Sequence, residues 1–235
     1  MLLYDREFIL RQSDFDCNDN IKLSALLDLF QTVAADHAVE LGLGFEDMKS
    51  KGLAWVIVKT KLDVLLPLHS SERIKIETLP HPKGLVDYTR DYFIYNQNGE
   101  LAVKGSSQWV LIDFVERKIT RTTVEFPGEF VDKFAYENRR FEKIAPFTCE
   151  QSTSYNVSVL DLDHNGHVNN IRYADMMLLV DGIAENKLVK TLSICFSNEA
   201  KLGDTVTLYS KKEGDVTTYS GYIGSVNCFT ASVTR

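Results

Sequence analysis

Apolar residues in the first half of the chain recur with the spacing of one long helix followed by several strands. Between positions 23 and 41 they return every three or four residues, and Gly42 then supplies a helix stop signal. Downstream segments are rich in β-branched and aromatic residues, and the pair Asn98 and Gly99, which tolerates positive φ, predicts a hairpin. We therefore expect one helix and an antiparallel meander, with strands over residues 1–11, 53–64, 73–79, 85–95 and 100–113.

The hydrophobic periodicity lapses over residues 124–146, where charged and aromatic residues mix, and we expect a connector there with room for one short helix. After it the pattern begins again, with a second helix predicted over residues 169–185. Strands are expected over residues 152–159, 189–197, 205–210, 217–223 and 228–234. These patterns predict an N-terminal unit at residues 1–130, a connector at 131–148 and a C-terminal unit at 149–235.

The second half repeats the first at a constant offset of 147 residues. Four polar residues are identical at this offset: Asp14, Asp16, Asn18 and Asp28 match Asp161, Asp163, Asn165 and Asp175. The second helix is apolar on most sides, so it must be covered all round, and a curved antiparallel sheet wrapped around one helix does this. That arrangement is the hot-dog fold. We therefore expect an α+β chain with a tandem (double) hot-dog fold and one continuous sheet.

Composition excludes several classes of protein. The formal net charge of −7 argues against a general nucleic-acid binder. No segment approaches the roughly 20 apolar residues of a membrane span, and the first residues lack a signal-peptide pattern, so we expect a cytoplasmic chain without a membrane contact. The four cysteines have no CxxC spacing, which indicates neither a disulfide framework nor zinc, and we expect none of them to be a nucleophile: Cys17, Cys149, Cys195 and Cys228.

Polar residues gather directly before the second helix, in the stretch DLDHNGHVNNIRY from Asp161 to Tyr173. The first turn of a helix leaves backbone N–H groups unpaired and carries the positive end of the helix dipole, so it favours negative charge. The comparison at offset 147 places Asn20 opposite His167, so only the second half carries the imidazole. One reactive site per chain is therefore expected.

The chemistry of this stretch suggests roles for three side chains. His167 can give or take a proton near neutral pH, and Asp163 is placed to orient it. Asn165 can hydrogen-bond through both ends of its amide, and backbone N–H groups of residues 168–170 would face a developing oxyanion. These roles predict acid–base chemistry at the start of the second helix.

Two other interpretations of the stretch remain open. The pattern D-x-D-x-N-G begins an EF-hand calcium loop, but the twelfth position is Arg172 where that loop needs a bidentate Glu. Alternatively, Asn169 and Asn170 simply cap the helix. No metal and no other cofactor is predicted.

DLDHNGHVNNIRY resembles the active-site signature D-x-N-x-H-V-N-N-x-x-Y of acyl-acyl carrier protein (acyl-ACP) thioesterases, in which it introduces the helix of the second hot dog. LFQTVAADH and AWVIV in the first half are similar to that family as well. The broader pattern D-x-x-G-H-V-N-N also occurs in hot-dog acyl-CoA thioesterases. The motif therefore indicates the superfamily more firmly than the substrate.

The resemblance implies catalytic roles for Asp163, Asn165 and His167, and for Glu199 in the segment FSNEAKLGD. A Cys commonly follows that Glu in the family, but Ala200 stands here, so a water attack assisted by Glu199 is favoured over a thiol nucleophile. The family uses the first hot dog as the acyl tunnel. Expected substrate-binding residues are Asn169, Asn170, Phe30, Ala34, Trp55 and Ile57.

The function implied by the resemblance is hydrolysis of fatty acyl-ACP thioesters, which releases free fatty acid and ends chain elongation. An acyl-CoA thioesterase and a non-catalytic acyl-binding protein are the alternatives. The expected partner is an acyl carrier protein, and a homodimer is left open. A basic patch for that partner would need Arg139, Arg140, Arg172 and Lys201 to lie together.

Overall fold

The chain folds around one continuous antiparallel sheet, and the computed structural model describes residues 1–181 and 188–235 of it. Within these residues the strand order is β1-β3-β4-β5-β2-β7-β10-β9-β8-β6. The strands are β1 (Tyr4–Ile9), β2 (Leu53–Val64), β3 (Arg73–Pro80), β4 (Asp87–Tyr95), β5 (Leu101–Asp113), β6 (Thr153–Asn156), β7 (Thr191–Phe196), β8 (Thr205–Glu213), β9 (Val216–Ile223) and β10 (Val226–Thr234). The helices are α1 (Leu23–Glu40), α2 (Phe45–Ser50) and α3 (Arg172–Asp181), with 3₁₀ turns η1 (Gln12–Asp14) and η2 (Val159–Asp161).

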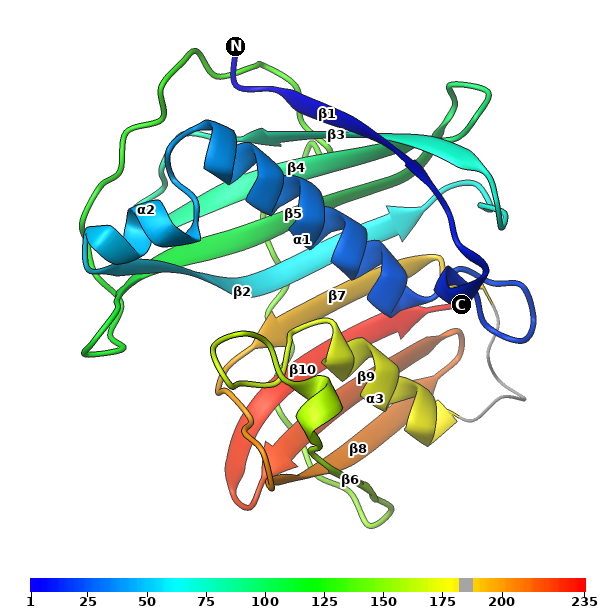
Figure 1. Ribbon diagram of the computed structural model, residues 1–235. Helices are drawn as coiled ribbons and strands as arrows, with labels where there is room; N and C mark the ends of the chain where they lie inside the picture. Colours follow the sequence, from blue (N-terminus) through cyan, green and yellow to red (C-terminus); the bar gives the residue numbers. More distant parts are fainter. Residues whose placement is uncertain (182–187) are drawn as a thin grey trace.

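The sheet consists of two similar halves that meet at β2 and β7. These strands pair antiparallel from Lys59 opposite Cys195 to Asp63 opposite Thr191. Helix α1 crosses the half formed by β1, β3, β4, β5 and β2, and α3 crosses the other half on the same side of the sheet (Figure 1). The predicted tandem hot-dog fold is therefore confirmed. The predicted unit boundaries fall in the irregular segment between β5 and β6, and they stay predictions.

Helix α1 forms where the apolar spacing predicts it, and it buries one face against the sheet. Leu26, Phe30 and Val33 are almost completely buried on that face. Each such side chain contributes about 1.5–3 kcal/mol by leaving water. Gly105 of β5 allows the close approach, because a Cβ there would stand 2.3 Å from the Phe30 ring. The Phe30 ring then stacks on Tyr92 of β4 with 4.2 Å between centroids.

Local chain geometry explains where helix predictions and structure differ. Helix α2 was not expected, because six residues are too few to show a period. The second helix begins three residues later than predicted, since Asn169 still belongs to the preceding loop and donates its N–H to Asp161 O at 2.9 Å. Its predicted end, residues 182–185, lies outside the described residues.

The expected short helix in the connector was wrong, because residues 124–146 run without regular structure along the outer face of the sheet (Figure 1). The backbone of this segment forms hydrogen bonds with groups of the sheet, and its own backbone bonds join residues two apart and do not build a helix. Lys61 Nζ donates to the carbonyl oxygens of Asn138 and Arg140 at 3.0 Å each, and Ala135 N donates to Asp91 Oδ2 at 2.9 Å. Contacts with distant strands, which the periodicity of the segment does not show, determine its path.

This route also divides the expected basic patch. Leu62 packs in the core beneath the helices, so the neighbouring Lys61 points to the opposite face, where it holds the backbone at Arg140. Arg172 lies on α3, on the helical face, and pairs with Asp175 at 3.1 Å. The four basic residues therefore do not form one patch. Among the described residues, no helix is both long and apolar enough to span a bilayer.

Candidate active site

Two carboxylates shape the loop that precedes α3. Asp161 accepts hydrogen bonds from Ser158 N at 2.7 Å, Ser158 Oγ at 2.8 Å and Tyr155 Oη at 2.8 Å. Burial acts to raise the pKa of Asp161, but these hydrogen bonds outweigh it and hold the pKa below its ordinary value. Asp161 therefore stays ionised and ties the loop to η2 and β6.

Asp163 closes the tight turn that carries the histidine. Its Oδ1 accepts from Asn165 N at 2.8 Å and His167 N at 3.2 Å, and its own N–H donates to His167 O at 2.8 Å. Gly166 completes this turn with φ +78°, a conformation that L side chains rarely adopt. Asp163 thus bonds to the backbone of His167, and through these bonds it orients the loop that holds the imidazole.

His167 and Glu199 are brought together by a short backbone pairing. Val168 N donates to Ala200 O at 2.8 Å, and His167 forms an isolated bridge with Lys201. As a result His167 Nε2 lies 3.2 Å from Glu199 Oε2. The imidazole is 18% exposed and the carboxylate 43%, so both reach solvent. An imidazole and a carboxylate at this separation can act together on one water molecule.

Arg117 joins this pair from the other half of the molecule. It lies in the turn after β5 and donates from a terminal guanidinium nitrogen to Glu199 Oε1, while His167 faces Oε2 of the same carboxylate. A charged turn such as VERK has no pattern that distinguishes this arginine from solvated neighbours. Its contact with Glu199 depends on how the two halves meet, and sequence analysis missed it.

A groove of about 560 Å³ runs along this cluster between the two halves. All four predicted catalytic residues border it, together with four of the six predicted substrate-binding residues: Asp163, Asn165, His167, Glu199, Asn169, Asn170, Trp55 and Ile57. His164 also borders the groove, with its ring 4.5 Å from that of Phe45 on α2. Residues far apart in sequence thus face one common space.

Fewer backbone N–H groups are free to bind an oxyanion than the sequence predicted. Val168 N–H and Asn169 N–H already donate to Ala200 O and Asp161 O, so neither can serve an oxyanion. Asn169 Oδ1 instead accepts from Ile171 N at 3.2 Å, which caps the start of α3. Asn170 N–H remains the backbone candidate, since the described part of the structure gives it no acceptor. The side chain of Asn170 borders the groove.

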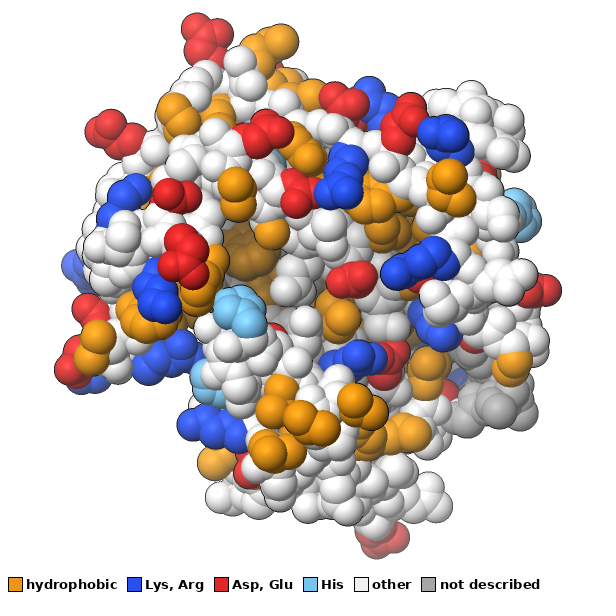
Figure 2. All heavy atoms as spheres, viewed as in Figure 1, with side chains coloured by type: hydrophobic (Ala, Val, Ile, Leu, Met, Phe, Trp, Pro, Cys, Tyr) orange, Lys and Arg blue, Asp and Glu red, His pale blue; other side chains and the backbone are white. Residues whose placement is uncertain are grey.

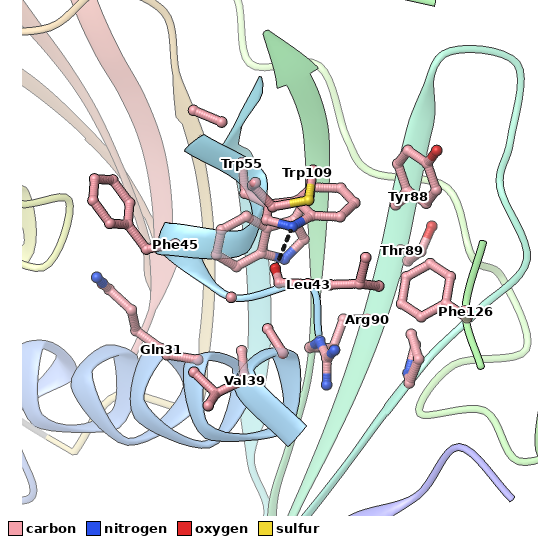
Figure 3. Close-up of a pocket in the computed structure, with 17 residues that line it drawn as sticks. Gln31, Val39, Leu43, Phe45, Trp55, Tyr88, Thr89, Arg90, Trp109 and Phe126 are labelled. Carbon is pink, nitrogen blue, oxygen red and sulfur yellow. Dashed lines mark hydrogen bonds between the residues drawn. The ribbon is translucent and has the colours of Figure 1, made fainter. Parts of the chain in front are cut away.

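An apolar pocket of about 270 Å³ adjoins the groove inside the N-terminal half (Figure 3). The two spaces share the residues Gln31, Phe45, Ala54, Trp55 and Trp109. Two expected lining residues, Ala34 and Trp55, border this pocket. In the space-filling view, a hollow with apolar atoms at its base opens between α1 and α2 (Figure 2). An apolar chain could therefore extend from the groove into the N-terminal half.

The other two expected lining residues do not border this pocket. Phe30 and Ile57 border a crevice of about 20 Å³, which is too small for a chain, and Ile57 also borders the groove. Phe30 is 2% exposed because its ring is stacked on Tyr92 in the core. Gln31, one residue later, borders both the groove and the pocket and was missed. A polar residue between apolar Leu27 and Ala34 on one helical face was the signal that could have found it.

None of the four cysteines, all of which lie within the described residues, borders the groove. Ala200 is completely buried, and its N–H donates to Tyr173 Oη at 3.3 Å. Cys228 is buried as well, and burial raises the pKa of its thiol to about 12. Among residues 1–181 and 188–235, no group of three or more His, Cys, Asp or Glu side chains is arranged to hold a metal ion. The polar groups that border the groove are therefore imidazole, carboxylate, amide and guanidinium, together with the hydroxyls of Ser197 and Tyr173.

Comparisons with known proteins agree with this arrangement. The sequence profile of the acyl-ACP thioesterase N-terminal domain matches residues 1–130, and that of the C-terminal domain matches residues 145–224. Oleoyl-acyl carrier protein thioesterase 2 of Arabidopsis thaliana is 25% identical over 89% of this chain and 63% of its own length. The palmitoyl-acyl carrier protein thioesterase of that plant is 25% identical over 84% of this chain and 52% of its own length. The chain thus spans between half and two thirds of these two relatives.

Solved structures show the same fold over the whole chain. The 12:0-ACP thioesterase from Umbellularia californica superposes with a TM-score of 0.86 and 20% identity, covering 100% of this chain and 97% of that one. An acyl-ACP thioesterase from Bacteroides thetaiotaomicron gives a TM-score of 0.81 and 17% identity, covering 99% and 97%. The matches to both domain profiles span most of the sequence, and the chain belongs to the acyl-ACP thioesterase family.

Proposed function

We propose that this chain hydrolyses fatty acyl-ACP thioesters and so releases free fatty acids. The observation that carries the proposal is the pair His167 and Glu199, 3.2 Å apart in a groove that adjoins an apolar pocket of the other half. A thioester carbonyl in the groove would face the polar pair, and its acyl chain would enter the pocket. Family membership supports the carrier protein as the thiol partner.

In the proposed reaction, water attacks the thioester carbonyl carbon. Glu199 and His167 take the proton of that water, and a C–O bond forms as negative charge develops on the carbonyl oxygen. Asn170 N–H and the Asn165 amide donate to this oxygen, and one such donor is typically worth about 10² to 10³ in rate. The C–S bond then breaks, and His167 returns the proton to the leaving thiolate.

Binding of the acyl chain supplies positioning. Each CH₂ that leaves water contributes about 0.8 kcal/mol, so two further carbons strengthen binding roughly tenfold while the pocket still has room. The shared residues Trp55 and Trp109 form the passage from groove to pocket. Holding the chain there fixes the thioester against the reactive pair.

The proposal is tested by measuring fatty acids released from a mixed acyl-ACP pool and from the same acyl chains on CoA. We expect a higher kcat/KM for the carrier-protein thioesters. Equal efficiency on CoA would make the chain an acyl-CoA thioesterase. Binding without release from either substrate would make it an acyl-binding protein. The matched variant Glu199→Gln keeps the shape of the side chain and should lower release by about 10² to 10⁴.

A further inference from the structure

Arg90 on β4 is a buried cation in the wall of a mostly apolar pocket, whose lining also includes the polar residues Gln31 and Thr89. It is 7% exposed, and its side chain extends from β4 toward α1 (Figure 3). It borders the part of the pocket that the groove does not share, in company with Val39, Pro80 and Phe126. Arg90 therefore lies at the end of the pocket away from His167 and Glu199.

The contacts of Arg90 are with neutral groups. A terminal nitrogen of the guanidinium lies 3.0 Å from His37 Nδ1 and 3.2 Å from Thr78 Oγ1, and both residues are buried. Burial, reinforced by the charge of Arg90, lowers the pKa of His37 to about 4, so this ring is neutral at neutral pH and can accept the hydrogen bond. Two acceptors leave several of the five guanidinium N–H donors for water in the pocket.

No carboxylate in the described part of the chain forms an ion pair with Arg90. The adjacent Asp91 faces the other side of β4, where its Oδ2 meets His81 Nε2 at 2.9 Å and accepts from Ala135 N at 2.9 Å. Burial lowers the pKa of Arg90, although the nearby Tyr92 phenol acts in the opposite sense. The largely buried Arg235 differs, because it pairs directly with Asp181. Arg90 is thus a desolvated charge. Its remaining N–H groups depend for hydrogen-bond acceptors on whatever occupies the pocket.

We propose that Arg90 limits the length of the acyl chain that this pocket accepts, an inference that rests on the proposed acyl-thioester function. A methyl end pressed against the guanidinium would remove water from its free N–H groups and offer no acceptor in exchange. Leaving such donors unpaired costs free energy, and the cost is larger for a charged group. A saturated chain therefore binds well up to Arg90 and poorly beyond it, whereas an oxygen at that point replaces the lost water.

The test is the profile of kcat/KM against chain length, measured with even-numbered saturated acyl-ACPs. Arg90→Met removes the charge and keeps an apolar side chain. We expect it to raise kcat/KM about tenfold for the chain two carbons beyond the wild-type limit. Arg73→Met is the matched control, because Arg73 is an exposed arginine on the neighbouring strand β3 that pairs with Glu7. It should keep the wild-type profile.

A second measurement uses the unchanged protein, so it holds even if Arg90→Met does not fold. The first saturated chain that the wild type rejects is compared with the same chain carrying a terminal hydroxyl. We expect the hydroxyl to restore turnover. A folded Arg90→Met with the wild-type profile, or equal rejection of both chains, would overturn the role of Arg90. Failure of the wild type to hydrolyse acyl-ACP of any length would instead overturn the proposed function.

Discussion

The loops before α1 and α3 have nearly the same backbone but different chemistry. Phe15 bridges Ile21 in the first loop as Leu162 bridges Val168 in the second. Asp16 Oδ1 accepts from the N–H groups two and four residues later at 2.7 and 3.0 Å, and Asp163 Oδ1 does so at 2.8 and 3.2 Å. The aspartates are therefore scaffold in both halves. The side chains differ at several positions, which include the fourth residue after each aspartate, where Asn20 stands opposite His167.

The interiors of the two halves also differ, and here it is the N-terminal half that has space for a ligand. Beneath α3, Met177 and Phe229 are almost completely buried, and the largely buried Asp181 pairs with Arg235 and accepts from Tyr219 Oη. The N-terminal half keeps a pocket, and its buried Arg90 has only neutral partners. The comparison fits the proposed division of roles, in which one copy keeps room for a chain and the other keeps the reactive groups.

The largest expected effect is a loss of turnover that a substitution causes in the loop before α3 and not in the loop before α1. His167→Ala should lower turnover of acyl-ACP by about 10² to 10⁴, because it removes the proposed acid–base group. Asn20→Ala, the matched change in the other loop, should leave kcat within about twofold, since that loop holds no reactive group. Steady-state kinetics of both variants checks this. Equal losses in the two would mean that the loops matter for folding alone.

The next effect concerns the filled interior of the C-terminal half. Asp181→Asn should lower the free energy of unfolding by about 3–5 kcal/mol, because it leaves Arg235 buried without its counter-charge. Glu7→Gln breaks the exposed pair with Arg73 and should cost about 1 kcal/mol or less. Urea unfolding of both variants gives the comparison. A loss at Asp181 no larger than that at Glu7 contradicts the assignment of a buried pair.

The free energy of unfolding should depend on pH through His37, which lies in the interior of the N-terminal half. The pKa of His37 is about 4 in the folded chain against 6.5 ordinarily, so the unfolded chain binds more protons between these values. Stability present above pH 6.5 is therefore lost as the pH falls toward 4, by about 3 kcal/mol in total. His37→Gln keeps an acceptor for Arg90 and should remove this dependence, while the exposed His69→Gln should retain it. Unfolding curves across this range decide between them.

The smallest effect tests the contact across the two halves. Arg117→Ala should lower kcat by a few fold and leave KM unchanged, since exposed pairs are worth about 0.2–1 kcal/mol and Arg117 acts through Glu199. In a Glu199→Gln background the same change should have little further effect. Arg121→Ala, four residues further along the segment after β5, is the control. An additive loss in the double variant would show that Arg117 acts independently of Glu199.

Patterns in the sequence predicted the elements whose residues repeat with a period. The helix at residues 23–41 and the strand at 53–64 agree with α1 and β2 within one residue. The motif DLDHNGHVNNIRY also located His167, because its polar residues lie close together in the sequence. The contact of His167 with Glu199, however, depends on backbone pairing with Ala200 and Lys201, which no local pattern contains.

Features built from distant contacts escaped prediction for the same reason. Arg117 reaches the site only because β2 and β7 join the two halves, and the connector is extended because it bonds to the sheet. Arg90 sits in a strand whose pattern looks ordinary, and only the fold places it in a pocket. The cytoplasmic location and the homodimer stay predictions, because contacts within one chain do not encode them.

The most direct test of the division of roles is a crystal structure with a non-hydrolysable amide analogue of an acyl-pantetheine thioester. The account predicts the amide carbonyl in the groove, within about 3 Å of His167, Glu199 or one water that they hold. The acyl chain should lie along Trp55 and Ala34, between α1 and the N-terminal half of the sheet. An acyl chain bound beneath α3, or a carbonyl remote from His167 and Glu199, would contradict it.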